Sequence, residues 1–390
     1  MSEFSPWPLF SDDEVTAVQE VLLSGKVNYW TGSECSNFEN EFAVWSRARY
    51  AVSLANGTVA LEVALRAFDV GKGDEVIVTP RTFIASVSSI VNVGATPVFA
   101  DFDLKSQNIT PRSIRLATTN KTKAVICVHL AGWPCEMDEI MDLSNEFGFY
   151  VVEDCAQAHG AKYKGRPVGA IGHIGCWSFC QDKIMTTGGE GGMVTTNNKD
   201  LWCKVWSYKD YGKSCESSFK KKASSGGFNW LHNSFGSNFR MTEMQATIGR
   251  VQLKKMPDWH KRRLDFSDKI WNAARECGGF RVPSTPEYIE YAAYKCYIFV
   301  EPSKLKSGWD RDKITQHIFQ MGVPCYSGSC PEVYLEKVFE NSGFKPEKRL
   351  TNAQYLGETS LMFLVHPSLT YQELEKTINS IKVIASQATY

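Results

Sequence analysis

The sequence predicts an α/β fold, in which a large three-layer domain built on a mostly parallel sheet is followed by a smaller α/β domain. Between residues 50 and 197, short continuously apolar segments alternate with segments of helical period. Strands that are apolar on both faces belong to parallel sheets covered by helices on both sides. After residue 197 the pattern changes to loops and long helices, and a shorter α/β pattern follows. The chain of 390 residues is long enough for two domains, which we place at residues 1–255 and 256–390.

The elements of the large domain follow from these patterns in order. Ser11 precedes three acidic residues, a typical helix N-terminus, and apolar residues at helical spacing continue this helix to Leu22. The apolar runs predict strands at 51–54, 75–79, 96–100, 124–129, 149–152 and 193–196, with helices at 59–68, 85–93 and 137–147.

The second half of the chain is predicted with fewer strands. The segment 214–233 is polar, contains three consecutive lysines, and is expected to be an exposed, mobile excursion. A helix at 241–253 is expected to break at Pro257 before helix 262–276 begins, because proline lacks the backbone N–H group. A strand at 296–300 and helices at 312–321 and 371–388 complete the smaller domain.

Composition limits the possible partners and the compartment. The chain has 43 basic and 43 acidic residues, so it has no long-range attraction for nucleic acid or an acidic membrane surface. Its N-terminus lacks a signal-peptide pattern, and its longest apolar runs are far shorter than the ~20 residues of a membrane span. The 12 cysteines contain no CxxC pair and are expected to be reduced core residues, with no metal site. We therefore expect a cytoplasmic protein.

A first candidate for chemistry lies between strand 51–54 and helix 59–68. Asn56, Gly57 and Thr58 occupy this turn. A glycine allows close backbone approach, the threonine hydroxyl can donate a hydrogen bond, and free N–H groups at a helix N-terminus favour an anion such as phosphate. The alternative is an ordinary helix cap with a turn glycine.

A second candidate is the carboxylate pair Glu153 and Asp154, which directly follows an apolar strand. Ligands of open α/β sheets bind at the carboxyl ends of the strands, and strand alternation turns one of the two side chains toward that crevice. A carboxylate there needs a cationic or protonated partner. The alternative role for Asp154 is a helix N-cap.

A third candidate is Lys183, which follows the apolar segment 175–179 and precedes four glycines within residues 188–192. A lysine in a partly dry site has a nucleophilic amine suited to Schiff-base chemistry. The glycine-rich string is not a P-loop, because GxxxxGK[ST] is missing and the lysine comes first. The alternative is a surface lysine before a glycine turn.

Together, these three candidates match the requirements for pyridoxal 5′-phosphate (PLP). The phosphate is held by the helix N-terminus, the carboxylate keeps the pyridine nitrogen protonated, and the lysine joins the aldehyde. None of the three is specific alone, but their combination favours a PLP enzyme.

A family resemblance supports the same interpretation. It rests on long motifs at family spacing: Asn-Gly-Thr-Val-Ala-Leu at 56–61, Gly-Asp-Glu-Val-Ile-Val at 73–78, Thr-Phe-Ile-Ala-Ser at 82–86, Gly-Ala-Thr-Pro-Val-Phe at 94–99, Val-Glu-Asp-Cys-Ala-Gln-Ala-His-Gly-Ala at 152–161, Ser-Phe-x-x-x-Lys at 178–183 and Gly-Glu-Gly-Gly at 189–192. The chain resembles the DegT/DnrJ/EryC1/StrS aminotransferases, a sugar aminotransferase family of fold-type I PLP enzymes. The match is continuous over about residues 8–255 and looser toward the C-terminus.

The resemblance implies a role for each matching position. Lys183 matches the Schiff-base lysine, which also moves the proton between substrate and cofactor, and Asp154 matches the partner of the pyridinium nitrogen. The remaining cofactor contacts implied are Gln157 beside the ring hydroxyl, Phe83 stacked on the ring, and Gly57, Thr58 and Ser178 at the phosphate. Asn238 matches an asparagine that reaches the phosphate of the neighbouring subunit, which implies a homodimer.

The resemblance also implies a reaction. An amino acid, expected to be L-glutamate, gives its amine to a keto group of a nucleotide-linked keto-deoxysugar, with carbon 4 favoured over carbon 3, in polysaccharide or other glycan biosynthesis. Related dehydratases carry histidine where this chain has Lys183, so transamination is favoured. The alternatives are a cyclitol aminotransferase or aminobenzoate-type synthase, and a non-catalytic regulatory relative. Segment 323–331 departs from the substrate loop expected for the family, so the sugar stays open.

Overall fold

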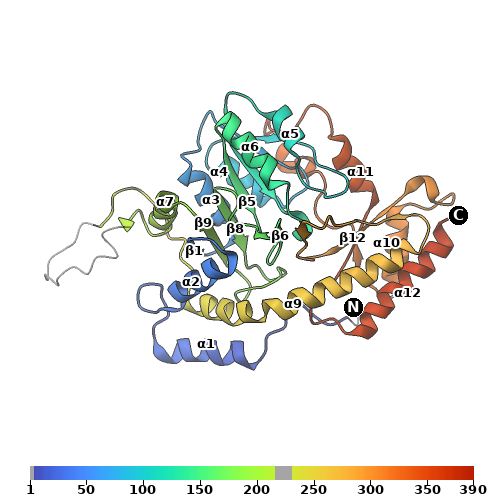
Figure 1. Ribbon diagram of the computed structural model, residues 1–390, viewed down its shortest axis with the longest axis horizontal. Coiled ribbons are helices and arrows are strands. Elements are labelled where there is room, and N and C mark those ends of the chain that lie inside the picture. Colours follow the sequence, from blue (N-terminus) through green and yellow to red (C-terminus); the bar gives the residue numbers. More distant parts are fainter. Residues whose placement is uncertain (1–3, 216–230) are drawn as a thin grey trace.

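The computed structural model describes residues 4–215 and 231–390 (Figure 1). The helices of these residues are α1 Asp12–Ser24, α2 Glu34–Ser46, α3 Gly57–Ala67, α4 Ala85–Asn92, α5 Pro111–Ala117, α6 Met137–Phe147, α7 Lys199–Lys209, α9 Glu243–Arg275, α10 Arg311–Gln320, α11 Thr351–Thr359 and α12 Tyr371–Ala388. The strands are β1 Tyr50–Leu54, β2 Glu75–Val78, β3 Thr96–Phe99, β4 Thr122–Val128, β5 Tyr150–Asp154, β6 Lys162–Tyr163, β7 Arg166–Pro167, β8 Ile174–Ser178, β9 Gly192–Thr196, β10 Phe280–Arg281, β11 Ile289–Glu290, β12 Cys296–Val300, β13 Cys325–Tyr326 and β14 Ser360–Phe363.

A seven-stranded sheet in the order β1-β9-β8-β5-β4-β2-β3 forms the centre of the molecule. The pairs from β8 through β5, β4 and β2 to β3 are parallel, whereas β9 runs antiparallel to both of its neighbours. The mostly parallel sheet of the predicted α/β fold is therefore confirmed. The reversed direction of β9 has a consequence for the site, because it brings the first residue of β9 to the carboxyl ends of β1 and β8.

The sheet is covered on both faces, which accounts for its continuously apolar strands. Along β4, Ile126 belongs to one core cluster, which includes residues of α3 and α4. The next residue, Cys127, belongs to another cluster, which includes residues of α6 and α9. Successive side chains of a strand point to opposite faces, so each face has its own core. This is the predicted three-layer arrangement.

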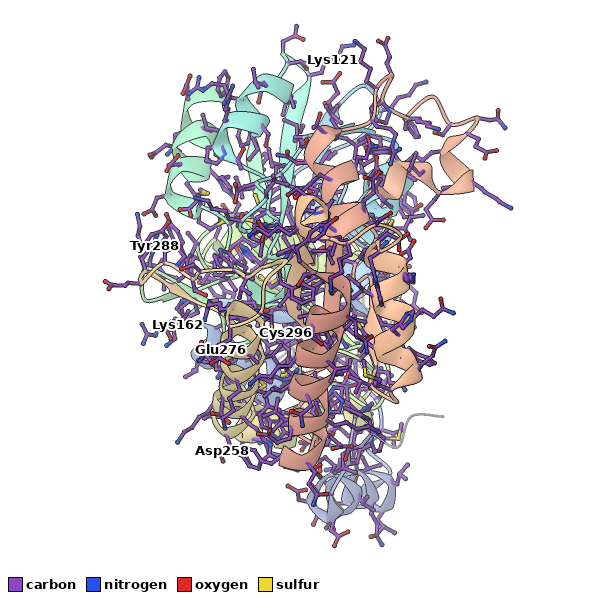
Figure 2. The ribbon with its side chains drawn as sticks, turned by 90° about the vertical axis from the view of Figure 1, so that its right-hand side faces the viewer. Lys121, Lys162, Asp258, Glu276, Tyr288 and Cys296 are labelled. Atoms are coloured by element: carbon purple, nitrogen blue, oxygen red, sulfur yellow. The ribbon has the colours of Figure 1, made fainter. Side chains whose placement is uncertain are left out.

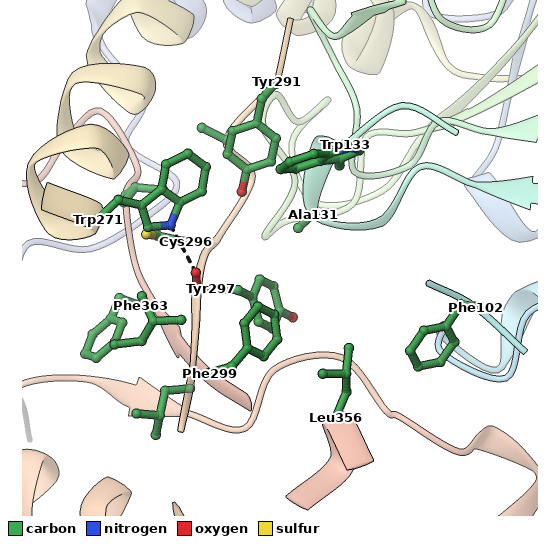
Figure 3. Packing of buried hydrophobic residues seen from close by; sticks show 14 of the residues in the cluster. Phe102, Ala131, Trp133, Trp271, Tyr291, Cys296, Tyr297, Phe299, Leu356 and Phe363 are labelled. Atoms are coloured by element: carbon green, nitrogen blue, oxygen red, sulfur yellow. Dashed lines mark hydrogen bonds between the residues drawn. The ribbon is translucent and has the colours of Figure 1, made fainter. Parts of the chain in front are cut away.

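The C-terminal part contains a second sheet, in the antiparallel order β10-β12-β14-β13. Figure 3 shows its β12 strand among aromatic side chains, with the Trp271 indole nitrogen of α9 donating to the Tyr297 carbonyl at 3.0 Å. These residues share one hydrophobic cluster with β4, β5 and α6. The division of the chain at residue 255 stays a prediction.

The predicted break at Pro257 is wrong. Helix α9 runs without interruption from Glu243 to Arg275, and Figure 1 shows it as one long helix that extends from α2 to the region of α12. An interior proline costs a helix about 3 kcal/mol. The Pro257 side chain is exposed, whereas Met256 and Phe266 on the same helix are fully buried. Burying such apolar side chains contributes about 1.5–3 kcal/mol each, which offsets the cost.

Most other predicted elements match the observed ones within one or two residues. The sequence analysis does not predict helices α2, α5, α7 and α11 or the short strands β6, β7, β10, β11, β13 and β14. The expected mobile excursion at 214–233 falls mostly on residues 216–230, which lie outside the described residues. In the described parts of the chain, no helix is both long enough and apolar enough to span a bilayer.

Candidate active site

The three sequence candidates meet at one edge of the central sheet. Gly57 begins the helix that follows β1, Asp154 ends β5, and Lys183 follows β8. Strands β5 and β8 are neighbours, and β9 lies between β8 and β1. Because β1, β5 and β8 point the same way, the segments after them converge at their carboxyl ends, as expected for the ligand site of an open α/β sheet.

The candidate phosphate site is built by close contact between backbone segments. Asn56 caps α3, its side-chain oxygen accepting from the Val59 N–H group at 3.0 Å. The N–H groups of Gly57 and Thr58, at the start of the helix, remain available for an anion. A Cβ atom on Gly57 would lie 2.6 Å from the Ser178 Cβ, and one on Gly192 would lie 2.3 Å from the Asn56 carbonyl oxygen. Only glycine fits at both positions. The first turn of α3 and Ser178 therefore form a narrow cradle suited to a phosphate.

Asp154 is a buried carboxylate whose two hydrogen bonds come from neutral donors. Its two oxygens accept from the Ser86 hydroxyl at 2.9 Å and from the Ala156 N–H group at 3.1 Å. Burial raises the pKa of Asp154, and these hydrogen bonds together with the Lys183 charge offset it only in part. A cationic group beside Asp154 would favour its ionised form. No helix begins at Asp154, so the N-cap alternative is wrong.

Glu153, the other carboxylate of the pair, is satisfied on the opposite side of β5. It accepts hydrogen bonds from N–H groups of turn 169–172 and from the His129 Nε2 at 3.0 Å. The His129 Nδ1 accepts from the Cys135 N–H group, so Nε2 must carry the proton. Together with Cys155, these side chains place three potential metal-ligand atoms within 4.8 Å of one another. Because Glu153 and His129 are hydrogen-bonded to each other and to backbone N–H groups, we interpret both as structural residues.

Lys183 is 17% exposed and lines a cavity of about 500 Å³. Its ammonium lies 3.5 Å from the Asp182 carboxylate and 5.4 Å from the centre of the Tyr294 ring. Its backbone carbonyl accepts a hydrogen bond from the indole nitrogen of Trp7 at 2.8 Å. The lysine is thus held in a partly dry position, and the surface-lysine alternative is wrong.

The same cavity contains two further predicted residues. Phe83 lies at its mouth with 69% of its surface exposed, so a ring face is free for stacking. The Gln157 side-chain oxygen accepts from the Ala131 N–H group at 2.7 Å, which leaves the amide nitrogen as a donor. The complete lining consists of Phe83, Gln157, Asp182, Lys183, Tyr294, Lys295, Tyr297, Tyr326, Gly328, Ser329, Cys330, Met362 and Leu364. Part of segment 323–331 therefore faces the cavity.

Of the predicted site residues, Phe83, Gln157 and Lys183 line this cavity, whereas Gly57, Thr58, Asp154 and Ser178 do not belong to its lining. Asn238 lies outside the lining as well. Its side chain is exposed, and its backbone pairs with Asp210. The next residue, Phe239, accepts a backbone hydrogen bond from Ala55, one position before the α3 cap. Within one copy of the chain, Asn238 is a surface residue near the site rather than part of its lining.

Sequence reasoning missed Trp7, Tyr294 and Lys295. Trp7 comes from the N-terminal segment, more than 170 residues before Lys183, and the other two precede β12 in the second half of the chain. No local pattern marks these positions, because Trp7 reaches the Lys183 backbone, and Tyr294 and Lys295 reach the cavity, through tertiary packing alone. The Tyr294 hydroxyl donates to the Asp182 carboxylate and so connects the two halves of the chain at the site.

The residues fit PLP on three observations. The cradle at Gly57 and Ser178 is too narrow for a side chain at residue 57, Asp154 is a buried carboxylate suited to a cation, and the Lys183 amine opens into the cavity. Gly57, Thr58 and Ser178 would hold the phosphate, Asp154 the ring nitrogen and Lys183 the aldehyde carbon. Fold and site together define the class of fold-type I PLP aminotransferases.

Comparison with known proteins specifies the family. The model of the DegT/DnrJ/EryC1/StrS aminotransferase family matches residues 8–382. The chain is 41% identical to GDP-perosamine synthase of Escherichia coli O157:H7 over 265 residues, which is 67% of this chain and 68% of the relative.

Solved structures give the same result. An aminotransferase from Psychrobacter cryohalolentis is 57% identical, with a TM-score of 0.97 over 98% of this chain and 99% of the other. Spr1654 of Streptococcus pneumoniae in its PLP form is 26% identical, with a TM-score of 0.86 over 98% and 99% of the two chains. The chain belongs to the DegT/DnrJ/EryC1/StrS aminotransferase family and is a PLP-dependent sugar aminotransferase.

Proposed function

We propose that this enzyme transfers the amine of L-glutamate to a keto group of a nucleotide-linked keto-deoxysugar, at carbon 4 rather than carbon 3, in surface polysaccharide or other glycan biosynthesis. The observation that carries the proposal is the opening of the Lys183 amine into a cavity that also contains Phe83 and Gln157. The volume of about 500 Å³ is within the usual range of small-molecule sites, about 300–1,000 Å³.

Each residue of the candidate site would have a separate role in this transamination. Lys183 Nζ would accept the proton from the substrate carbon and donate it again, so one amine would serve both half-reactions. Asp154 keeps the pyridine nitrogen protonated, and Gln157 donates to the ring hydroxyl. PLP itself supplies the electron-accepting ring that stabilises negative charge at the substrate carbon. Phe83 would stack on the ring, and Gly57, Thr58 and Ser178 would hold the phosphate.

The nucleotide-linked acceptor is supported by the relatives. The Escherichia coli relative is named for a GDP-linked product, GDP-perosamine. The cavity wall of tyrosines, serine and glycine from segments 294–297 and 326–330 offers hydroxyl and backbone groups for a sugar. Neither observation selects the nucleotide, and carbon 4 rests on the resemblance of segment 56–61 alone.

We also propose a homodimer in which Asn238 acts in trans. Asn238 is exposed and lies outside the cavity of its own chain, next in sequence to a residue bonded to the α3 entrance. A second copy related by a two-fold axis would then place this asparagine at the partner's phosphate site, and the reciprocal contact would form at the same time.

The test is amination by the purified holoenzyme of a panel of 3-keto and 4-keto nucleotide sugars, with L-glutamate and other amino acids as donors, and with inositol ketones as rival acceptors. Product carbons are assigned by NMR. We expect amination of a 4-keto nucleotide sugar from L-glutamate. Amination of the inositol ketones instead would favour a cyclitol aminotransferase. The absence of any absorbance change with every amino acid would indicate a non-catalytic relative.

A further inference from the structure

The cavity wall around residues 294–297 carries positive charge that the described residues balance only in part. Lys295 lines this cavity together with Lys183. Its ammonium lies 4.9 Å from the centre of the Tyr294 ring, and no described residue forms an ion pair with it. Burial lowers the pKa of Lys295 to about 8. The charge of the Asp182 carboxylate acts on Lys295 but offsets the effect of burial only in part. A partly buried ammonium that forms no ion pair with a described residue is suited to binding an anion.

Arg263 of α9 lies behind the same wall and is only 2% exposed. One of its nitrogens, Nη1, donates to the Tyr294 carbonyl at 3.3 Å. Its Nε and Nη2 atoms are buried without a hydrogen-bond partner among the described residues, and burial lowers the pKa of Arg263 to about 9. A buried guanidinium without a counter-ion is costly, so this arginine adds to the excess of positive charge.

The other charged groups around this wall do not cancel the excess. Asp182 is the nearby carboxylate, and it is shared by the Tyr294 hydroxyl and the Lys183 ammonium. Burial opposes ionisation of Asp182, but the charges of Lys183 and Lys295 and the hydrogen bond from Tyr294 outweigh it and lower its pKa. One carboxylate thus faces two lysines. His366 is kept neutral near pH 7, because burial and the charges of Arg263 and Lys295 lower its pKa to about 3. Once Lys183 is engaged with the cofactor, Lys295 is the cation left in the described lining.

Lys295 is also held in place by the turn that orients Gln157. The Ala292 and Tyr294 N–H groups donate to the carbonyls of Gly132 and Ala131, at 2.9 and 3.0 Å. Ala131 donates in turn to Gln157. Figure 3 shows Ala131 and Trp133 beside Tyr291, at the start of this segment. The backbone that carries Lys295 is therefore fixed relative to Gln157 before any substrate arrives, which reduces the entropy lost on binding.

We propose that Lys295, supported from behind by Arg263, binds an anionic oxygen group of the substrate inside the cavity. The inference rests on the proposed function, which supplies two such groups: the carboxylates of the amino donor and the diphosphate of the nucleotide sugar. Both substrates enter the cavity that contains Lys183, so either group can meet Lys295. Ammonium pairs with both carboxylate and phosphate, and the experiment below has one arm for each.

The experiment uses holoenzyme and measures the first half-reaction in single turnovers, by the absorbance change of the bound cofactor on mixing with L-glutamate. Lys295→Met removes the charge and Lys295→Arg keeps it. Lys162→Met is the matched control, because Lys162 is an exposed lysine paired with Glu290 at 2.8 Å, at the edge of the molecule in Figure 2. The second arm measures inhibition of the same half-reaction by inorganic pyrophosphate.

If Lys295 binds the donor carboxylate, Lys295→Met raises the half-saturating glutamate concentration about tenfold or more, with a much smaller change in the maximal rate. If it binds the diphosphate, the inhibition constant of pyrophosphate rises by that factor instead. Lys295→Arg retains most of the affinity, and Lys162→Met behaves as wild type. Changes below about twofold in both arms overturn the inference. If the wild-type enzyme gives no absorbance change with glutamate, the proposed amino donor is wrong. This outcome is distinct from a failure of the inference about Lys295.

A pH profile provides a second measurement that does not depend on the Met variant being stable. The relevant anion affinity of the wild type is expected to weaken as pH rises through about 8, because Lys295 loses its charge there. The charged groups that act on Lys295 are Asp182, which raises its pKa, and Arg263 and Lys183, which lower it. In Lys295→Arg the charge persists, so this loss is expected to disappear. Identical profiles for the two proteins would count against the inference.

Discussion

Two adjacent carboxylates of β5 have different chemistry because their hydrogen-bond partners differ. Glu153 faces backbone N–H groups and His129, which lower its pKa in spite of complete burial. Asp154 has two neutral donors, and burial raises its pKa. Strand alternation separates the two side chains, and the fold supplies each with its environment. The pKa of each carboxylate therefore depends on its surroundings more than on whether the residue is Glu or Asp.

Asp154→Asn tests the role of the second carboxylate. The amide has the same shape and can still accept from Ser86, but it cannot balance a positive ring nitrogen. Loss of one partner of a buried charge pair costs about 3–5 kcal/mol, so we expect the rate of the donor half-reaction to fall by a factor on the order of 10² or more. Stopped-flow absorbance measures this rate. An unchanged rate with bound cofactor would contradict the assignment.

Trp7→Phe tests whether the N-terminal segment positions Lys183. Trp7 packs against Trp259 and His366, and phenylalanine keeps an aromatic ring there while removing the N–H group that reaches the Lys183 carbonyl. One hydrogen bond contributes about 1 kcal/mol, so we expect kcat to fall about fivefold with little change in KM.

A structural role of Trp7 alone predicts a different result, namely a lower Tm with unchanged kcat. The absorbance of the lysine-bound cofactor as a function of pH separates the two cases, since a displaced lysine shifts its titration. Trp259→Phe serves as the control, because it alters the same aromatic cluster without touching the Lys183 carbonyl.

At the scale of elements, the site depends on where strands and helices end. Strand β9 runs against its neighbours, so Gly192 at its start meets Leu54 at the end of β1 and Ser178 at the end of β8. The two glycines then allow the α3 entrance to approach Ser178. The phosphate cradle is thus a product of strand direction as well as of the motif at 56–58.

Gly57→Ala tests this close approach. The added methyl group would lie 2.6 Å from the Ser178 Cβ, so the first turn of α3 must move away from Ser178. We expect the Kd for PLP, measured by absorbance titration of cofactor-free protein, to rise at least about tenfold. Gly71→Ala is the control, because its methyl group would meet nothing nearer than 3.8 Å. Equal affinities of the two variants would argue against the cradle.

Pro257→Ala tests how much this proline destabilises α9, the helix that the sequence predicts to break here. Alanine restores a backbone donor and removes a residue that costs about 3 kcal/mol inside a helix. The side chain at this position is exposed, so no core packing is lost. We expect the free energy of unfolding to rise by about 1–3 kcal/mol, seen as a higher urea midpoint, with activity unchanged. A lower midpoint would mean that α9 requires the proline.

At the scale of the whole molecule, the cavity is assembled from segments that are far apart in sequence. Phe83 and Gln157 come from the first half of the chain, and Tyr294, Lys295 and the 326–330 segment come from the second. Asn238 lies outside this cavity. A complete site in the proposed homodimer therefore requires contributions from two parts of one chain and from a second copy.

The proposed trans arrangement predicts complementation between inactive variants. Lys183→Ala and Asn238→Ala homodimers each have two defective sites. A heterodimer of the two, purified with different affinity tags, combines the intact Lys183 of one chain with the intact Asn238 of the other. We expect about half of the wild-type activity per dimer, because one of two sites is complete. Full activity of the Asn238→Ala homodimer, or an inactive heterodimer, would contradict the trans role.

The alternation of buried strands and amphipathic helices, the motifs at 56–58 and 153–154 and the glycine-flanked Lys183 can all be predicted from the amino-acid sequence, because they are local patterns of apolar period and turn chemistry. The sequence identified the family and the cofactor from those motifs. Only the tertiary structure decided the continuity of α9 through Pro257, the reversed direction of β9, and the meeting of Trp7, Tyr294 and Lys295 with Lys183. Each of these depends on packing between residues distant in the chain, which no local propensity records.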